Sequence, residues 1–500
     1  MEDNIKITYT KNMSKFNFNS TLNIPIDANA NIKTILDINS YLFDLKVDCG
    51  NGKAVVSGKV GVKAVYLDTD NMTNTVTDSQ SFNEIYSDSS ITSDTFLNLY
   101  NATITNTLLS KDSNLKINCD VNIAPVAYLN LSFANQIQDN NMLITKKSSI
   151  TTNTIQQCIN SQFEYVSNLE TKDVISKILC HNSYFTAEKT TPANGYAVVE
   201  GKLVCSVLYE TTDGDDRKLK EMKDTSRVKF DVEIVGLDTN NILDLSYLLD
   251  KSLDDISFEM EDNNSVVTIK NTVKVCGVVL KNISLDIVDD VYSIENDIET
   301  ASTKREFTKS TNDFTYSDVI SNEVTLNQDE PAIDEVIANL GITPEITNSY
   351  LKDEMLFVEG VISSNLSYVD ENKEIKRKQI EIPFIINTKH NASTLNSTHY
   401  NISVLDSRVK IKRGTIIEME YSIFINCYVY EQETHEMIDS FKIGKQLDFS
   451  KYDFQIFLTK PGETVWDLCK RIKIAPSEIH KYNKDLPLVM EGKEKIIIKR

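Results

Sequence analysis

The sequence lacks any apolar run approaching the length of a membrane span, and Glu2 and Asp3 precede its first apolar segment. A helix that crosses a bilayer needs about 20 predominantly apolar residues, and a secretory signal needs a basic start followed by an apolar centre. We therefore expect no transmembrane segment and no signal peptide. On this basis the protein should remain in the compartment where it is made.

Cysteine pairs and histidine clusters are also missing. The eight cysteines are scattered without a C-x-x-C pair, and the five histidines show no metal-ligand spacing. Cys119, Cys276 and Cys427 lie within strand-like alternation, which favours reduced and mostly buried thiols. Cys180 and His181 are neighbours, but adjacent side chains point apart on most backbones. The sequence thus predicts no metal site, and nothing in it implies a cofactor.

Signatures of common enzyme classes are absent. The chain contains no G-x-S-x-G elbow, no G-x-x-x-x-G-K phosphate loop and no G-x-G-x-x-G turn. With 73 Asp and Glu residues, neighbouring carboxylates arise by default, so a paired-carboxylate glycosidase is neither indicated nor excluded. The acidic residues 213–216 could form a calcium loop, but they lack the distal Glu of an EF-hand, so a solvated turn is the better interpretation. We expect a protein that is not an enzyme.

Positive charge is scarce and unevenly placed. The formal net charge of −21 argues against nucleic acid as a partner, because phosphate binding needs a basic surface. Residues 459–500 contain ten Lys or Arg and six Asp or Glu, so this segment carries +4 and the rest about −25. A basic segment suits an acidic protein surface or an anionic wall polymer. The alternative is that the positive charge of this segment has no functional meaning, because small basic domains are common.

The most informative positive feature is a repeated segment at residues 54–66, 197–209 and 356–368. In each copy an apolar strand-like run carries a glycine, and a tyrosine follows eight residues later. The glycine would permit a bulge or a close backbone approach, and a polar turn comes next, which predicts three β-hairpins. The structural residues of the repeat are Gly58 and Tyr66, Gly201 and Tyr209, and Gly360 and Tyr368.

Further elements recur around each hairpin. A short helix is predicted before each copy, from i, i+3, i+4 apolar spacing. The residues concerned are Ile32, Ile35 and Leu36; Val174, Ile175, Ile178 and Leu179; and the segment from Pro331 to Gly341. An alternating strand closes each unit at residues 115–123, 267–275 and 417–429. We therefore predict a mainly β fold with short helices, in tandem units at residues 1–150, 151–310 and 311–450.

Residues 452–500 have a different pattern. A strand at residues 455–458 precedes the turn Pro461-Gly462, and Thr464 is a helix N-cap with Asp467 in the first turn. Pro476 starts a second short helix that Asn483 closes, and residues 495–498 form another strand. The segment is therefore predicted to be a small α+β domain in strand, helix, helix, strand order.

This C-terminal segment resembles the LysM module, whose fold has the same order of elements. The resemblance rests on Lys460-Pro-Gly-Glu-Thr-Val-Trp-Asp-Leu, with Ile479 and Asn483 downstream. LysM modules usually bind the N-acetylglucosamine chains of peptidoglycan or chitin in a shallow groove. The resemblance places that groove at Gly462, Glu463, Thr464, Asn483, Lys484, Leu486, Pro487 and Leu488. Trp466, Leu468 and Ile479 are expected to be structural.

The whole chain resembles the clostridial spore-coat proteins that combine three SPOCS domains with one LysM module. The resemblance implies a protein of the mother-cell cytoplasm at the forespore surface, whose LysM module docks to the polymerising ATPase of the coat basement layer. It implies a non-catalytic adaptor in coat assembly that works by multivalency, with self-assembly possible. The alternative is a protein that binds peptidoglycan or N-acetylglucosamine in the cell wall or cortex.

Overall fold

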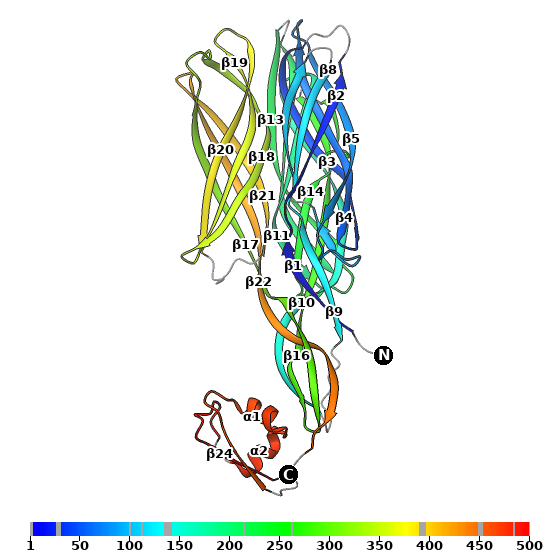
Figure 1. Ribbon diagram of the computed structural model, residues 1–500. Helices are drawn as coiled ribbons and strands as arrows, with labels where there is room; N and C mark the ends of the chain where they lie inside the picture. The colour runs from blue at the N-terminus through cyan, green and yellow to red at the C-terminus, as the bar shows by residue number, and fades with distance from the viewer. Residues whose placement is uncertain are drawn as a thin grey trace.

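The computed structural model describes residues 4–26, 32–99, 102–111, 114–134, 143–213, 216–261, 264–389, 397–448, 454–483 and 486–499. Within these ranges the chain is mainly β, as predicted, with two short helices that both lie near the C-terminus. Long strands form an elongated body, and a small module follows at one end (Figure 1). The body contains three groups of strands, which we call units 1, 2 and 3.

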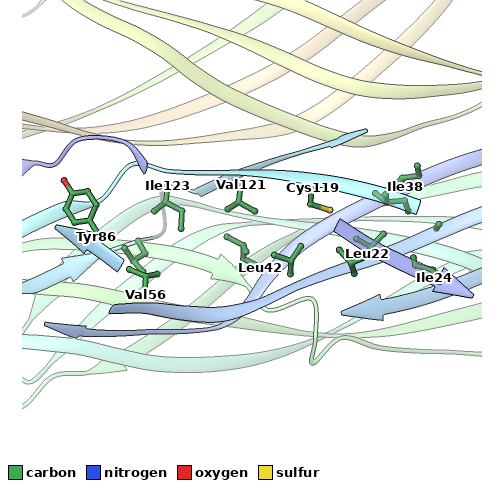
Figure 2. Packing of buried hydrophobic residues seen from close by; sticks show 14 of the residues in the cluster. Leu22, Ile24, Ile38, Leu42, Val56, Tyr86, Cys119, Val121 and Ile123 are labelled. Atoms are coloured by element: carbon green, nitrogen blue, oxygen red, sulfur yellow. The ribbon is translucent and has the colours of Figure 1, made fainter. Parts of the chain in front are cut away.

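Unit 1 is a sandwich of two three-stranded sheets. One sheet has the order β3-β4-β5 and the other β2-β8-β7, while β6, β9 and β1 belong to a seven-stranded sheet that continues into unit 2. Figure 2 shows Leu42 and Val56 from one sheet and Val121 from the other, all directed into the interior. The strands are β1 (Asn4–Asn12), β2 (Phe16–Pro25), β3 (Ile32–Gly50), β4 (Lys53–Asp68), β5 (Thr73–Ser87), β6 (Phe96–Asn98), β7 (Ala102–Lys111), β8 (Asn114–Ile123) and β9 (Val126–Ala134).

Unit 2 has the same plan. The sheet β11-β12-β13 packs on a second sheet in which β16 lies between β10 and the edge strands β14 and β15. The far parts of β10 and β16 continue as a long two-stranded ribbon, from the pair Leu143 and Ser293 inward. The strands are β10 (Leu143–Thr171), β11 (Ile175–Ala193), β12 (Tyr196–Asp213), β13 (Asp216–Glu233), β14 (Ile242–Leu249), β15 (Asp255–Glu261) and β16 (Asn264–Ser293).

Unit 3 repeats the plan once more. The sheet β18-β19-β20 packs on the sheet β17-β22-β21, and β17 and β22 extend beyond the sandwich as a ribbon. The predicted boundaries at 150/151 and 310/311 therefore fall inside β10 and β17, whose pairing starts near residues 143 and 296. The strands are β17 (Asn296–Thr325), β18 (Ile333–Lys352), β19 (Met355–Asp370), β20 (Ile375–Lys389), β21 (Ser397–Lys412) and β22 (Ile416–Gln446).

The strands expected from the repeated segment are confirmed. Residues 54–66, 197–209 and 356–368 lie in the central strands β4, β12 and β19, and Tyr66, Tyr209 and Tyr368 are each 3% exposed. The closing strands expected at 115–123, 267–275 and 417–429 are β8 and the first halves of β16 and β22. The turn expected at Gly214 and Asp215 lies outside the described residues.

The short helices predicted before each hairpin are wrong. Those residues belong to the strands β3, β11 and β18. Near its start, each strand shifts register against its partner at two places three residues apart, between Ile32 and Thr34 and again between Ile35 and Asp37 in the first case. A bulge adds one residue to a strand, so apolar residues three apart face the same side. Two bulges therefore produced the spacing that was interpreted as helical.

The extra residue of the second bulge packs between the units. Leu36, Leu179 and Ile337 occupy equivalent bulges in the three units and share one buried cluster, which also contains Val65 and Leu208. A second shared cluster joins Val126, Tyr128, Val278, Leu280, Tyr428 and Tyr430. Burial of a leucine side chain contributes about 1.5–3 kcal/mol, so these clusters hold the units as one body.

A polar group also links all three units. Asp244 of β14 is completely buried and accepts hydrogen bonds from the hydroxyls of Tyr128 in unit 1 and Tyr430 in unit 3. His399 Nδ1, also in unit 3, lies 3.2 Å from Asp244 Oδ1. Burial alone would raise the pKa of Asp244, but His399 and these hydrogen bonds outweigh it and lower the pKa. The buried carboxylate is therefore held ionised by groups from neighbouring units.

The C-terminal module contains β23 (Phe454–Leu458), α1 (Val465–Ile472), α2 (Pro476–Tyr482) and β24 (Lys495–Lys499). β23 and β24 pair antiparallel, and the helices cover one face of this small sheet. Thr464 caps α1, and its hydroxyl accepts a hydrogen bond from the Asp467 backbone N–H. Leu468 and Ile479, which we expected to be structural, are completely buried.

Candidate functional site on the C-terminal module

The first stretch of the predicted groove, residues 462–464, lies beside Val489 and Met490, which directly follow the second stretch. The backbone N–H of Gly462 donates to Met490 O at 2.9 Å, and that of Met490 donates to Glu463 O at 2.8 Å. Thr464 forms an isolated β-bridge with Val489. The turn before α1 therefore contacts the end of the loop that follows α2.

The polar residues of the first stretch are engaged within the module. Glu463 is only 7% exposed and forms an ion pair with Arg471, with Nε 2.7 Å from Oε1. The hydrogen bond from Arg471 is the main reason that the pKa of Glu463 is lowered. The Thr464 hydroxyl serves the capping box with Asp467. Gly462 is exposed with φ +79°, and a side chain there would meet open space.

The second stretch presents mainly apolar groups. Asn483 hydrogen-bonds to the backbone of β24, donating to Ile497 O at 2.7 Å and accepting from Ile497 N at 2.8 Å. Leu486 packs partly on the module core, Pro487 is exposed, and Leu488 is 90% exposed. Lys484 lies outside the described residues. The described part of the groove thus uses its polar side chains to hold the fold and exposes Pro487 and Leu488.

Trp466 lies at the junction between the module and the body, away from the predicted groove. It is partly buried, and its indole N–H donates to Asp290 Oδ2 of β16 at 2.8 Å. Its ring meets the ring of Tyr292 edge-on at 5.1 Å between centroids. Lys470, one turn along α1, forms an ion pair with Asp290 at 2.7 Å. Trp466 therefore joins α1 to the end of the β10–β16 ribbon. Figure 1 shows the module beside that end of the ribbon.

Tyr292 completes this junction. It is 1% exposed, and its hydroxyl donates to Ile474 O in the loop between the two helices at 2.6 Å. Burial alone would raise the pKa of Asp290, but the hydrogen bonds from Lys470 and Trp466 outweigh it and lower the pKa. A buried aromatic contact and a charged hydrogen-bond group thus fix the orientation of the module on unit 2.

The outer face of the β23–β24 sheet was not found by sequence reasoning. On it Phe454, Ile456, Leu458 and Ile497 are 61%, 67%, 61% and 43% exposed. Lys495 and Lys499 pair with Leu458 and Phe454 and border this apolar face. Three consecutive isoleucines at 496–498 were the available signal, because a strand of a two-stranded sheet covered on one side must turn one of them outward.

Comparisons with protein-family models, with curated proteins and with solved structures gave no match to this chain. Within the described residues, no helix has the length and apolar character needed to cross a membrane. The same residues contain no group of three or more His, Cys, Asp or Glu side chains placed to hold a metal ion.

Proposed function

We propose that this protein is a non-catalytic structural adaptor of the spore coat, with three SPOCS-type units and a LysM module that docks to a protein. The observation that carries the proposal is the exposed apolar face of Phe454, Ile456, Leu458 and Ile497. Contiguous apolar surface of this kind is characteristic of interaction sites. The expected partner remains the ATPase of the coat basement layer.

The charge around this face favours an acidic partner. Lys495 and Lys499 flank the apolar residues, and Lys499 lies over the ring of Phe454 at 5.8 Å from its centroid. A partner with an apolar centre and carboxylates at its rim would complement both features. The rest of the chain carries a net negative charge, so an acidic partner would be repelled by the body and attracted to the module.

The junction supports the adaptor role in a second way. Trp466, Lys470 and Tyr292 hold α1 against the ribbon, so the β23–β24 face is directed away from the body. A module held in one orientation loses less rotational freedom on binding than one on a flexible linker. The three units would supply further contacts at the forespore surface on the mother-cell side, and linked contacts add avidity.

Glycan binding in the module groove is the weaker candidate. A sugar chain is recognised by polar side chains that are available to its hydroxyl and acetamido groups. Glu463, Thr464 and Asn483 already make hydrogen bonds that hold α1 and β24 in place. The groove surface around Leu488 is apolar and suits protein better than a hydrated sugar.

The test is binding of the full chain to the purified coat ATPase, measured by isothermal titration calorimetry. Ile456→Glu should weaken binding at least tenfold, because a carboxylate would be buried in the apolar contact. Ile385→Glu is the matched control, since Ile385 is equally exposed on β20 of unit 3 at 63%. Equal affinity of both variants and the parent would contradict the proposed face. Co-sedimentation of the full chain with peptidoglycan would instead favour the glycan candidate.

A further inference from the structure

A cleft of about 390 Å³ lies between unit 1 and unit 3, far from the C-terminal module in sequence. Unit 1 contributes Asn12, Thr103 and Asn122, and unit 3 contributes residues 344–349 of β18 together with Thr398 and residues 400–402 of β21. The volume falls within the range of about 300–1,000 Å³ that is usual for small-molecule sites. The cleft exists because β18 of unit 3 faces the edge strand β7 of unit 1.

The lining combines polar and apolar side chains and is almost uncharged. Among the described residues, four asparagines, three threonines, one serine and one tyrosine contribute to it beside apolar residues such as Met13, Val126 and Ile346, and Lys15 and Glu345 are the charged members. One cation and one anion give no net charge. Amide and hydroxyl groups both donate and accept hydrogen bonds, so they match a ligand rich in hydroxyl or acetamido groups. The lining therefore suits a neutral ligand that presents both polar and apolar faces, as a sugar ring does.

Tyr400 adds a second, independent observation. Its ring lines the cleft, while its phenolic oxygen is buried near Ser349, Thr398 and Cys427. A tyrosine ring in the wall of a cleft offers an apolar face suited to a sugar ring.

A second, smaller space adjoins the cleft. A smaller space of about 70 Å³ shares Thr103 and Glu345 with it and extends toward Asn106, Ser364 and Gln379. The lining there has the same amide and hydroxyl character. An elongated ligand of several similar polar groups would fit this arrangement better than a compact one.

An extended polypeptide is the main competitor, because β7 and β18 are edge strands of their sheets. Strand addition needs a regular row of backbone donors and acceptors. β18 interrupts that row with Pro344, which has no N–H, and with register shifts between Leu340 and Thr343 and between Ile346 and Asn348. Prolines and bulges are the usual means by which an edge strand avoids pairing. Side-chain recognition is therefore favoured over strand addition.

We propose that the cleft between units 1 and 3 is a binding site for a neutral oligosaccharide. The site is separate from the module groove and goes beyond the adaptor function. Tyr400 would contact a sugar ring, and Asn122 and Thr103 would hydrogen-bond to its substituents.

The experiment is calorimetric titration of the full chain with β-1,4-linked tetrasaccharides of N-acetylglucosamine and of glucose. At least one should bind, and both Thr103→Val and Asn122→Ala should weaken that binding at least fivefold. Thr103→Val keeps the shape of the side chain and removes only the hydroxyl, so the fold should be retained, which thermal unfolding would verify. Leu488→Ala in the module groove is the control and should leave the affinity unchanged.

Several results would overturn the proposal. Binding that is lost in Leu488→Ala and kept in the two cleft variants would place the sugar on the module. Absence of binding by both tetrasaccharides would exclude the ligand class tested. Selective binding of a neutral Asn- and Thr-rich decapeptide would assign the cleft to polypeptide. None of these outcomes depends on the ATPase titration, so failure of the adaptor proposal would be seen separately.

Discussion

Asp37 occupies a position that the other two units fill with uncharged residues. It follows the bulge residue Leu36, and the equivalent positions are Cys180 and Ala338. Asp37 is 1% exposed, and burial raises the pKa of its carboxyl to about 6 despite Arg377, Lys251 and Asn365 nearby. At neutral pH the body therefore contains a buried carboxylate whose ionised form is disfavoured.

We predict that Asp37→Asn stabilises the protein at pH 7.5 and has little effect at pH 4. A carboxyl whose pKa is higher in the folded state favours folding below the unfolded value of 3.8, and this contribution is lost as pH rises through about 6. The shift corresponds to about 3 kcal/mol at neutral pH. Urea unfolding at both pH values measures it. A variant that is less stable than the parent at pH 7.5 would show that the carboxylate is net favourable.

At the scale of single elements, each repeated glycine is explained by a bulge in the strand that pairs with it. Gly58, Gly201 and Gly360 each lie opposite a register shift in the preceding strand. A side chain at Gly201 would overlap the carbonyl oxygen of Thr186, and one at Gly360 would overlap Glu345 O and the Phe384 ring. At Gly58 the nearest atoms are side-chain carbons of Leu45 and Phe82 at 3.0 Å. Unit 1 should therefore tolerate a small side chain at position 58 better than units 2 and 3 tolerate one at positions 201 and 360.

We predict that Gly360→Ala destabilises the protein by about 2–3 kcal/mol, because a backbone carbonyl cannot move aside without breaking the strand pair. Gly58→Ala is the matched variant, and it should cost less than about 1 kcal/mol, since Leu45 and Phe82 can change rotamer. Chemical unfolding of both variants gives the comparison. Equal losses of stability in the two variants would mean that the close approach of Glu345 O is not the reason for glycine at position 360.

At the scale of the whole molecule, the decisive contact is the one between the C-terminal module and unit 2. Tyr292 and Asp290 at the end of β16 meet Trp466, Lys470 and Ile474 of the module. The packing is continuous, because Tyr292 belongs to the same buried cluster as Leu468 and Ile479. Trp466 is the chain's only tryptophan, so its fluorescence reports this junction alone.

We predict that Asp290→Ala releases the module from the ribbon, with a red shift of tryptophan emission as the indole becomes hydrated. Loss of a charged hydrogen-bond acceptor costs about 1.5–3 kcal/mol, or roughly a tenfold or greater shift toward the undocked state. Asp289→Ala is the control, because the neighbouring Asp289 accepts a hydrogen bond from Ser148 Oγ of β10 at 2.9 Å, within the ribbon itself. Unchanged emission in Asp290→Ala would show that Tyr292 alone holds the module.

Lowering the pH should also release the module from the ribbon. Because the pKa of Asp290 is lowered in the folded state, its contribution is present above the ordinary value near 3.8 and is lost as pH falls through the lower folded value. Emission from Trp466 should therefore shift red in acid in the parent. In Asp290→Ala the emission should already be red-shifted at neutral pH and should change less when the pH is lowered.

Periodicity and turn chemistry were sufficient for the strands β4, β12 and β19, for the cap at Thr464 and for the buried Leu468 and Ile479. These features depend on neighbours within a few residues, which a sequence displays directly. The bulges of β3, β11 and β18 were missed because apolar residues three apart suit a bulged strand and a helix equally well. Only the partner strand distinguishes the two.

The sequence by itself thus determined the central strands β4, β12 and β19 and how the first helix of the module begins, because local sterics and hydrogen bonding decide these. Only the tertiary structure decided that Leu36, Leu179 and Ile337 meet in one cluster and that Asp244 is shared by three units. It also placed Trp466 on Asp290 and directed Ile456 to solvent. Hydrophobic burial is non-directional, so a pattern states that a side chain must be covered without stating by which distant residue.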